Sequence, residues 1–110
     1  MRIAILTVSL IMVFVSPAFG GEIYGSIELN GRSIGGGLEI EIKCSDAARS
    51  TKTDEIGSYR FYTKKSGKCT LKLKYGNEPF PEIEIYSYEG TVRYDLVLES
   101  VDGRYRLRRK

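Results

Sequence analysis

Apolar and polar side chains alternate in several segments spread through residues 22–98 of this 110-residue chain, and this period of two constrains the fold more than any other feature. The alternation is clearest at residues 22–29, 38–44, 59–63, 69–75 and 92–98, and it recurs over the shorter stretch 83–86. Successive side chains of a β-strand point to opposite faces of a sheet, so the pattern predicts strands with one buried face. No ten-residue window has the period of an amphipathic helix. The chain is therefore expected to be all-β.

Turn-forming residues separate these segments. Asn30–Gly31 is the strongest hairpin signal, and Asp102–Gly103 is another turn. A short edge strand is expected around residues 50–53, and a last strand around Tyr105 and Leu107. Seven or eight short strands at this spacing favour a sandwich of two sheets.

The N-terminus has the three parts of a secretory signal. Arg2 precedes an apolar run at residues 3–15, and the small residues Ala18 and Gly20 follow it. We expect cleavage after Gly20, with residues 1–20 as the signal peptide and 21–110 as the domain. A membrane anchor is the alternative, but a spanning helix needs about 20 apolar residues. The mature protein is thus expected to be secreted or periplasmic, with no stable membrane span.

Two cysteines, Cys44 and Cys69, are expected to form a structural disulfide bond. An even number of cysteines in an exported chain is typical of bridged thiols. Their wide spacing and the lack of histidine are unlike a zinc site, so no metal is expected.

The cysteines also suggest a register for their strands. If Cys44 lies opposite Cys69 in an antiparallel pair, Ile42 faces Leu71 and Ile40 faces Leu73 on the same side. The other side then pairs two glutamates with two lysines, Glu41 with Lys72 and Glu39 with Lys74. Opposite charges across a strand pair are favourable, and a slip of one residue would invert both faces.

The formal charge is +3, nearly balanced, and we expect no nucleic-acid partner. Most of the basic surplus lies in the last seven residues, 104–110. Such a tail could contact phosphate, acidic lipid or polyanionic glycan, and the alternative is a solvated strand end or a frayed terminus.

Three segments resemble a known family: residues 23–27 with Asn30–Gly31, residues 37–40, and residues 53–61. The last one reads Thr-Asp-Glu-Ile-Gly-Ser-Tyr-Arg-Phe and matches a Thr-Asp-x-x-Gly-x-Tyr-x-Phe turn. Over about residues 22–100 the chain is similar to carboxypeptidase regulatory-like domains of the transthyretin-like (prealbumin-like) class. The resemblance implies an antiparallel Greek-key sandwich. It also implies that Asp54 caps the turn, that Gly57 adopts a backbone conformation other residues resist, and that Tyr59 completes the motif.

The sequence contains no evident set of catalytic residues. Hydroxyisourate hydrolases, which share the transthyretin fold, depend on histidines, and this chain has none. Related adhesin domains form a Lys–Asn isopeptide bond, but both asparagines, Asn30 and Asn77, lie in predicted turns. Alternating glutamates are explained as solvated strand faces, and no calcium-loop or phosphate-loop spacing occurs. We expect neither an enzyme nor a cofactor.

Exposed aromatic residues are the remaining binding candidates. Strand parity places Tyr24, Tyr62, Tyr86 and Tyr88 outward, and Phe80 lies between two prolines; together they form the candidate surface. Tyrosines that simply cover the edge of the core are the alternative.

Three functions fit this class of chain. The leading hypothesis is a non-catalytic module that binds another envelope or extracellular protein through a sheet edge or the tyrosine face, or that supports a larger assembly. The alternatives are a carbohydrate-binding module of starch-binding-like fold and a polymerising envelope subunit.

Overall fold

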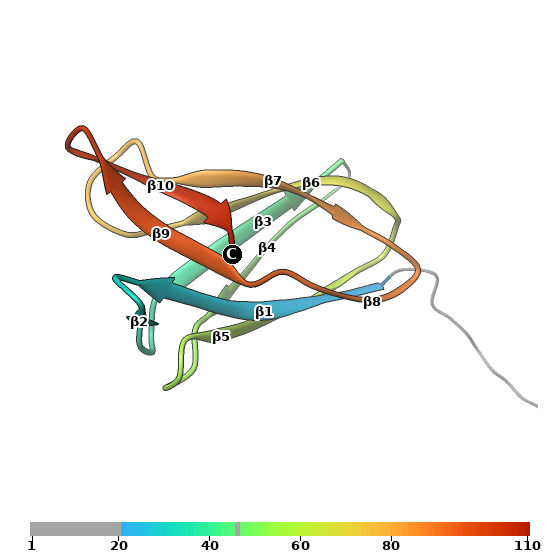
Figure 1. Ribbon diagram of the computed structural model, residues 1–110. Helices are drawn as coiled ribbons and strands as arrows, with labels where there is room; N and C mark the ends of the chain where they lie inside the picture. The colour runs from blue at the N-terminus through green and yellow to red at the C-terminus, as the bar shows by residue number, and fades with distance from the viewer. Residues whose placement is uncertain (1–20, 46) are drawn as a thin grey trace, which may run out of the picture.

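Two β-sheets pack face to face in the computed structural model of the protein, as Figure 1 shows. The structure describes residues 21–45 and 47–110, so the expected signal peptide lies outside the described residues. The first sheet contains β1 (Gly21–Leu29), β2 (Arg32–Ser33), β5 (Ser58–Thr63), β8 (Gly90–Arg93), β9 (Leu96–Val101) and β10 (Arg104–Arg109). The second contains β3 (Glu39–Cys44), β4 (Ala47–Lys52), β6 (Gly67–Leu73) and β7 (Glu82–Ser87). The all-β sandwich is thereby confirmed. The described part of the chain has no helix long and apolar enough to cross a membrane.

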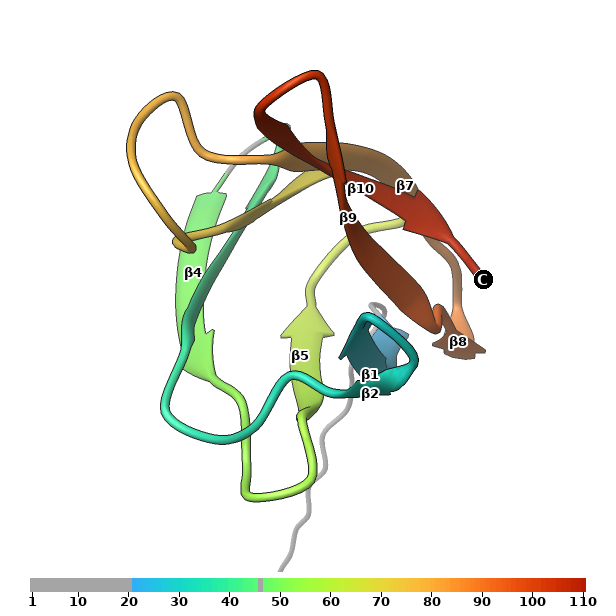
Figure 2. The same cartoon turned by 60° about the vertical axis from the view of Figure 1, so that its left-hand side comes forward.

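The strand order makes β1 the centre of the first sheet. That sheet runs β10-β9-β1-β2, with β5 and β8 also paired to β1, and the second runs β4-β3-β6-β7 (Figure 2). Ten strands are present among the described residues where seven or eight were expected. The difference comes from the two-residue strand β2 and from a break that divides the segment 92–98 into β8 and β9.

The core is built from the inward side chains that strand parity predicts. Ten of them are at most 1% exposed: Ile23, Ile27, Ile40, Ile42, Cys69, Leu71, Leu73, Ile85, Leu96 and Leu98. A change from a buried leucine or isoleucine to alanine lowers the free energy of unfolding by about 2–5 kcal/mol. The buried faces of both sheets therefore fix their mutual orientation.

The register expected for the cysteine strands is confirmed. Cys44 lies directly opposite Cys69, their sulfurs are bonded, and their Cα atoms are 4.2 Å apart. The outer charges also face each other as expected, and Lys74 Nζ lies 3.0 Å from a carboxylate oxygen of Glu39. Lys72 is opposite Glu41, but its Nζ lies 3.6 Å from Glu82 on the other neighbouring strand.

Parallel pairing of β1 is a feature that the alternation did not indicate. β1 runs antiparallel to β5, but its other edge runs parallel to β8 and then to β9. At the break between β8 and β9, the backbone of Tyr94 crosses close to Gly25. A Cβ atom on Gly25 would lie 1.8 Å from the Tyr94 carbonyl oxygen, so the crossing requires glycine.

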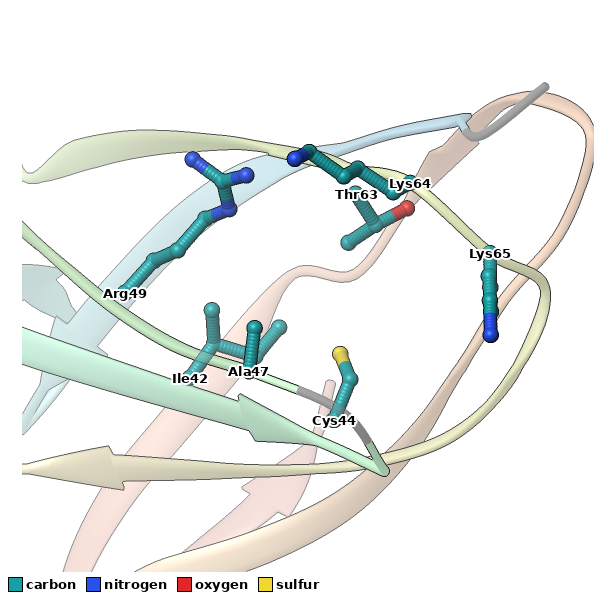
Figure 3. Close-up of a pocket in the computed structure, with 7 residues that line it drawn as sticks. All are labelled: Ile42, Cys44, Ala47, Arg49, Thr63, Lys64 and Lys65. Atoms are coloured by element: carbon teal, nitrogen blue, oxygen red, sulfur yellow. The ribbon is translucent and has the colours of Figure 1, made fainter. Parts of the chain in front are cut away.

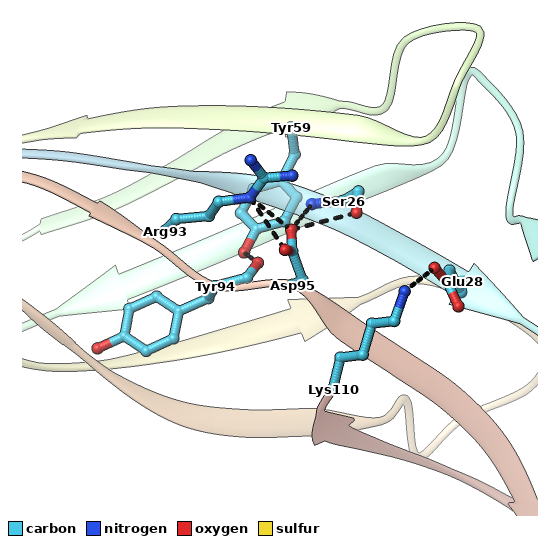
Figure 4. Close-up of polar contacts among 7 residues, drawn as sticks. All are labelled: Ser26, Glu28, Tyr59, Arg93, Tyr94, Asp95 and Lys110. Carbon is cyan, nitrogen blue, oxygen red and sulfur yellow. Dashed lines mark hydrogen bonds and ion pairs between the residues drawn. The ribbon is translucent and has the colours of Figure 1, made fainter.

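A polar corner holds this break in place (Figure 4). Asp95 Oδ1 accepts hydrogen bonds from the backbone N–H and the hydroxyl of Ser26, and both carboxylate oxygens accept from Arg93 Nε. The Tyr59 hydroxyl donates to the Tyr94 carbonyl at 2.7 Å. Burial, reinforced by the charge of Asp95, raises the pKa of Tyr59.

The basic C-terminal segment is an ordered strand. β10 pairs with β9 along its whole length. Arg106 and Arg108 both bind Glu99, at 2.8 and 2.9 Å, and Lys110 Nζ lies 2.6 Å from Glu28. Three of its cations are therefore already paired within the domain.

Candidate functional site

The aromatic residues selected from the sequence do not form one surface. Tyr24 and Tyr62 lie on β1 and β5, in the first sheet, whereas Tyr86 lies on β7 in the second. Tyr62 is 61% exposed and Tyr88 is 52% exposed. A ligand that touched Tyr24 and Tyr62 could not also touch Tyr86 without wrapping around the sandwich.

Phe80 and Tyr88 lie beyond opposite ends of β7. Six strand residues separate the loop that carries Phe80 from Tyr88, and at about 3.3 Å per residue this places them roughly 20 Å or more apart. Phe80 therefore belongs to a different surface from Tyr86 and Tyr88.

Tyr24 is already engaged within its own sheet. The guanidinium groups of Arg60 and Arg93 lie 5.9 and 5.6 Å from the centre of its ring. Each arginine also has an acidic partner, since Arg60 binds Glu22 and Arg93 binds Asp95. Tyr24, the two arginines and their acidic partners thus contact one another on the face of the sheet.

Two of the turn motif residues, Asp54 and Gly57, lie between β4 and β5, and the third, Tyr59, lies on β5. Asp54 Oδ1 accepts hydrogen bonds from the backbone N–H groups of Ile56 and Ser58, at 3.0 and 2.9 Å. Gly57 has a φ of 77°, in the left-handed region that favours glycine. Tyr59 is buried. These residues shape a turn, in which one oxygen of the exposed Asp54 carboxylate is used by the backbone.

A groove with ligand-like dimensions lies at one end of the sandwich. It runs between the loop that follows β6, residues 75–81, and the hairpin that joins β9 to β10, and its volume is about 760 Å³. Figures 1 and 2 both show this loop and the hairpin tip side by side. We call it the loop–hairpin groove. Its size falls in the usual range for small-molecule sites, about 300–1,000 Å³.

Aromatic rings line the loop–hairpin groove on both sides. Phe80 comes from the loop and Tyr105 from β10, and Tyr75 packs edge-on against Tyr105 with ring centres 4.9 Å apart. Tyr105 also lies over Gly76, where an added Cβ would be 3.3 Å from the ring. Tyr105 remains 41% exposed, so an aromatic surface faces the groove while its inner edge is held by Tyr75.

The two walls of the groove carry opposite charges. Glu78 and Glu82 lie on the loop side, and Arg104 and Arg106 lie on the hairpin side. Glu82 is near Lys72 and Arg106 binds Glu99, so these two are partly neutralised. Among the described residues, no hydrogen bond or ion pair joins the side chains of Arg104 and Asn77 to a partner. The Arg104 guanidinium therefore offers free donors on the hairpin wall, and the Asn77 amide offers a donor and an acceptor on the loop wall.

Sequence reasoning named Phe80 but missed the rest of this groove. Tyr75 ends the alternating segment 69–75 and is half-buried at the core edge. Tyr105 was regarded as a residue of the last strand, which it is. Nothing in strand periodicity shows that residues some 25 positions apart meet at one end of the fold. The described residues contain no cluster of three or more potential metal ligands.

No protein-family model and no curated protein sequence matches the chain. Solved structures do resemble it. The TIE protein of Bacillus anthracis aligns with a TM-score of 0.63 and 14% identity, over 76% of this chain and 17% of that one. A DUF3823 family protein from Parabacteroides merdae aligns with a TM-score of 0.58 and 10% identity, over 84% of this chain and 48% of the other.

A further similar structure comes from Bacteroides uniformis and is provisionally described as a carbohydrate-binding protein. Its TM-score is 0.52 at 18% identity, over 81% of this chain and 53% of that one. This chain thus spans about half or less of the length of these three structures. At such low identities the similarity establishes one conclusion, that the chain has a β-sandwich fold found within larger proteins.

Proposed function

We propose that the protein is a non-catalytic carbohydrate-binding module and that the loop–hairpin groove receives a neutral saccharide. The observation that carries this proposal is the meeting of aromatic rings, the exposed Tyr105 and the half-buried Phe80 and Tyr75, with opposite charges in one groove of about 760 Å³. Sugar rings present apolar C–H faces and polar hydroxyl edges, which such a groove can contact together.

The opposite charges of the walls favour an uncharged ligand. A ligand of one charge sign would be attracted to one wall and repelled by the other. Hydroxyl groups both donate and accept hydrogen bonds, so a neutral sugar can accept from Arg104 and donate to Glu78. The Bacteroides uniformis neighbour, with its provisional description, is consistent with this ligand class.

The same proposal includes an extracytoplasmic location. The disulfide between Cys44 and Cys69 is of a kind that persists in oxidising compartments. The signal-like sequence before Gly21 supports export. We also propose membership of the carboxypeptidase regulatory-like domains, which the Asp54 turn and the sandwich support.

The test is a glycan array probed with the purified protein, followed by titration calorimetry with the best ligand. Tyr105→Ala and Phe80→Ala are expected to weaken binding about tenfold or more, because each removes a ring from the groove. Arg104→Ala is expected to weaken it to a similar extent through a lost donor.

The matched control is the Tyr86→Ala, Tyr88→Ala double variant, which removes exposed tyrosines outside the groove. It should bind as the wild type does. Thermal unfolding of every variant separates lost binding from lost structure. Failure of the wild-type protein to bind any array glycan would refute the proposal, as would equal losses in the groove variants and the control.

A further inference from the structure

Strand β4 forms an open edge of the second sheet. It pairs with β3 from Ala47 opposite Cys44 to Lys52 opposite Glu39, and no other described strand is hydrogen-bonded to it. All of its side chains except Thr51 are exposed. Figure 2 shows β4 at the side of the sandwich, away from the β9–β10 hairpin.

The hydrogen bonds next to β4 show which of its backbone groups are free. Thr53 N–H donates to the Leu38 carbonyl, so the backbone of Thr53 faces the β3 side. Residues two apart along a strand face the same way, which directs 51, 49 and 47 toward β3. The N–H and C=O groups of Ala48, Ser50 and Lys52 therefore point to the open edge.

A small basic pocket lies beside this edge, on the inner side of the sheet (Figure 3). Ile42, Cys44 and Ala47 form its apolar lining, and its volume is about 20 Å³, enough for a methyl-sized group. The long side chains of Arg49, from β4, and Lys64, after β5, point toward one another across the opening in Figure 3. Lys65 lines the same pocket.

Positive charge continues along the edge itself. Lys52 ends β4, and Lys43 lies opposite Ala48 on β3. Glu41 on the outer face lies between Ser50 and Lys72 in the sheet, and Asp46 lies outside the described residues. Neither Arg49 nor Lys64 makes an ion pair with another described residue. The edge thus presents free strand hydrogen-bonding groups next to Arg49 and Lys64, two cations that form no ion pair within the described part of the chain.

We propose that the β4 edge binds an extended acidic segment of another protein, which adds as a strand beside β4. Backbone hydrogen bonds to Ala48, Ser50 and Lys52 would supply the pairing, and carboxylates on alternate residues would meet Arg49 and Lys64. A small apolar side chain of the segment would enter the pocket at Ala47. A second copy of this chain is disfavoured, because pairing two β4 edges brings like charges together.

The test uses a short labelled peptide with two glutamates and one valine at alternate positions, so that all three lie on one face of an extended strand, and with threonine at the positions between them. Its binding is followed by fluorescence anisotropy. Two matched peptides carry glutamine or lysine in place of glutamate. The acidic peptide is expected to bind, more weakly as salt rises, and the glutamine peptide about tenfold more weakly. Equal binding of the acidic and glutamine peptides would overturn the charge-based assignment.

Two variants locate the peptide on the protein. Arg49→Glu with Lys64→Glu should weaken binding of the acidic peptide at least about tenfold. Ser50→Pro should abolish it, because proline removes an N–H that faces the open edge while the β3 ladder is kept. Circular dichroism confirms the fold of each variant. Arg32→Glu, on the exposed strand β2 of the other sheet, is the matched control and should bind normally.

Hydrogen exchange locates the bound peptide without any substitution, so it serves if the proline variant does not fold. In the wild-type protein, the amide protons of Ala48, Ser50 and Lys52 should exchange more slowly when the acidic peptide is bound. Unchanged exchange there would overturn the inference, and so would a dimer of the protein alone that is lost in the Arg49→Glu, Lys64→Glu variant. Since neither readout involves sugar, the result is independent of the loop–hairpin groove.

Discussion

Tyr94 connects the two sheets through its side chain, while its backbone bonds to residues of the first sheet. Its hydroxyl accepts from the Tyr86 N–H at 3.1 Å and donates to the Tyr86 carbonyl at 3.0 Å, so it satisfies both backbone groups of one residue in β7. Its own carbonyl accepts from the Tyr59 hydroxyl. The ring is 6% exposed, and the guanidinium of Arg109 lies 4.9 Å from its centre.

Changing Tyr94 to phenylalanine tests this connection. The Tyr86 N–H and C=O would lose their partner while the ring stays in place, so we expect the free energy of unfolding to fall by about 1–3 kcal/mol. Urea denaturation measures it. Tyr88→Phe removes a hydroxyl from an exposed tyrosine and should change stability by less than about 0.5 kcal/mol. Equal effects of the two variants would mean that the Tyr94 hydroxyl does not stabilise the fold.

Asp95 makes the stability of the fold depend on pH. Burial alone would raise the pKa of Asp95, but hydrogen bonds from Arg93 and Ser26 outweigh it and hold the pKa below its usual value. A carboxyl group with a lower pKa in the folded protein stabilises the fold above its unfolded pKa, about 3.9. That contribution is lost as the pH falls through the folded value.

We therefore expect Asp95→Asn to be less stable than the wild type at pH 7 and to lose less stability between pH 5 and pH 2. Urea titrations at both ends of this range measure the difference. Glu55→Gln, in the exposed turn after β4, is the control for removing one negative charge. Parallel pH profiles of the wild type and Asp95→Asn would show that the carboxylate has no role in acid stability.

At the scale of elements, β3 and β6 are the best-defined pair. Their register follows from the sequence because the cysteines, the apolar rows and the outer charges all agree on one alignment. The disulfide lies at the end of this pair, next to the turn that leads into β4. A cross-link there limits the unfolded chain over 25 positions of sequence.

Loss of the disulfide should lower the stability of the whole domain. We expect the Cys44→Ala, Cys69→Ala variant to unfold with a free energy about 3 kcal/mol smaller than the wild type, mostly through the freer unfolded chain. Denaturant unfolding with and without a reducing agent measures this. The reductant should lower the stability of the wild type toward that of the variant and leave the variant unchanged.

Other elements could not be predicted from local pattern. The break at Tyr94–Asp95 has no turn-forming sequence, and Tyr94 keeps the inward parity of Leu96 and Leu98. What divides β8 from β9 is the approach of Gly25 on a distant strand, which a single strand's periodicity cannot reveal. The loop–hairpin groove escaped prediction for the same reason, because it depends on which two loops share an end.

For the molecule as a whole, the first described strand, β1, begins at Gly21, directly after the signal-like sequence. The N–H of Gly21 donates to Thr63 Oγ1 at 3.2 Å, and a Cβ on Gly21 would lie 1.9 Å from the Tyr88 carbonyl oxygen. Gly21 is thus packed into the first sheet. Cleavage after Gly20 would leave β1 entire, whereas a cut within β1 would remove central pairing.

We therefore expect the exported protein to begin at Gly21. Intact-mass analysis of protein recovered from the periplasm or medium of an expressing bacterium measures this, and the mass should also show the two hydrogens lost in the disulfide. Recovery of a membrane-bound form that retains Met1 would contradict both the cleavage and the secreted location.

The central place of β1 also governs when the chain can fold. Its partners β8 and β9 lie some 70 positions further along the sequence, as the pairings of Gly21 with Gly90 and of Ile27 with Leu96 show. Pairing between such distant segments gives a high contact order and slow folding, in milliseconds to seconds. The first sheet cannot be completed until nearly the whole chain has been synthesised. A chain whose central sheet forms late could be threaded through a membrane channel before it folds, which is what the export proposed above would require.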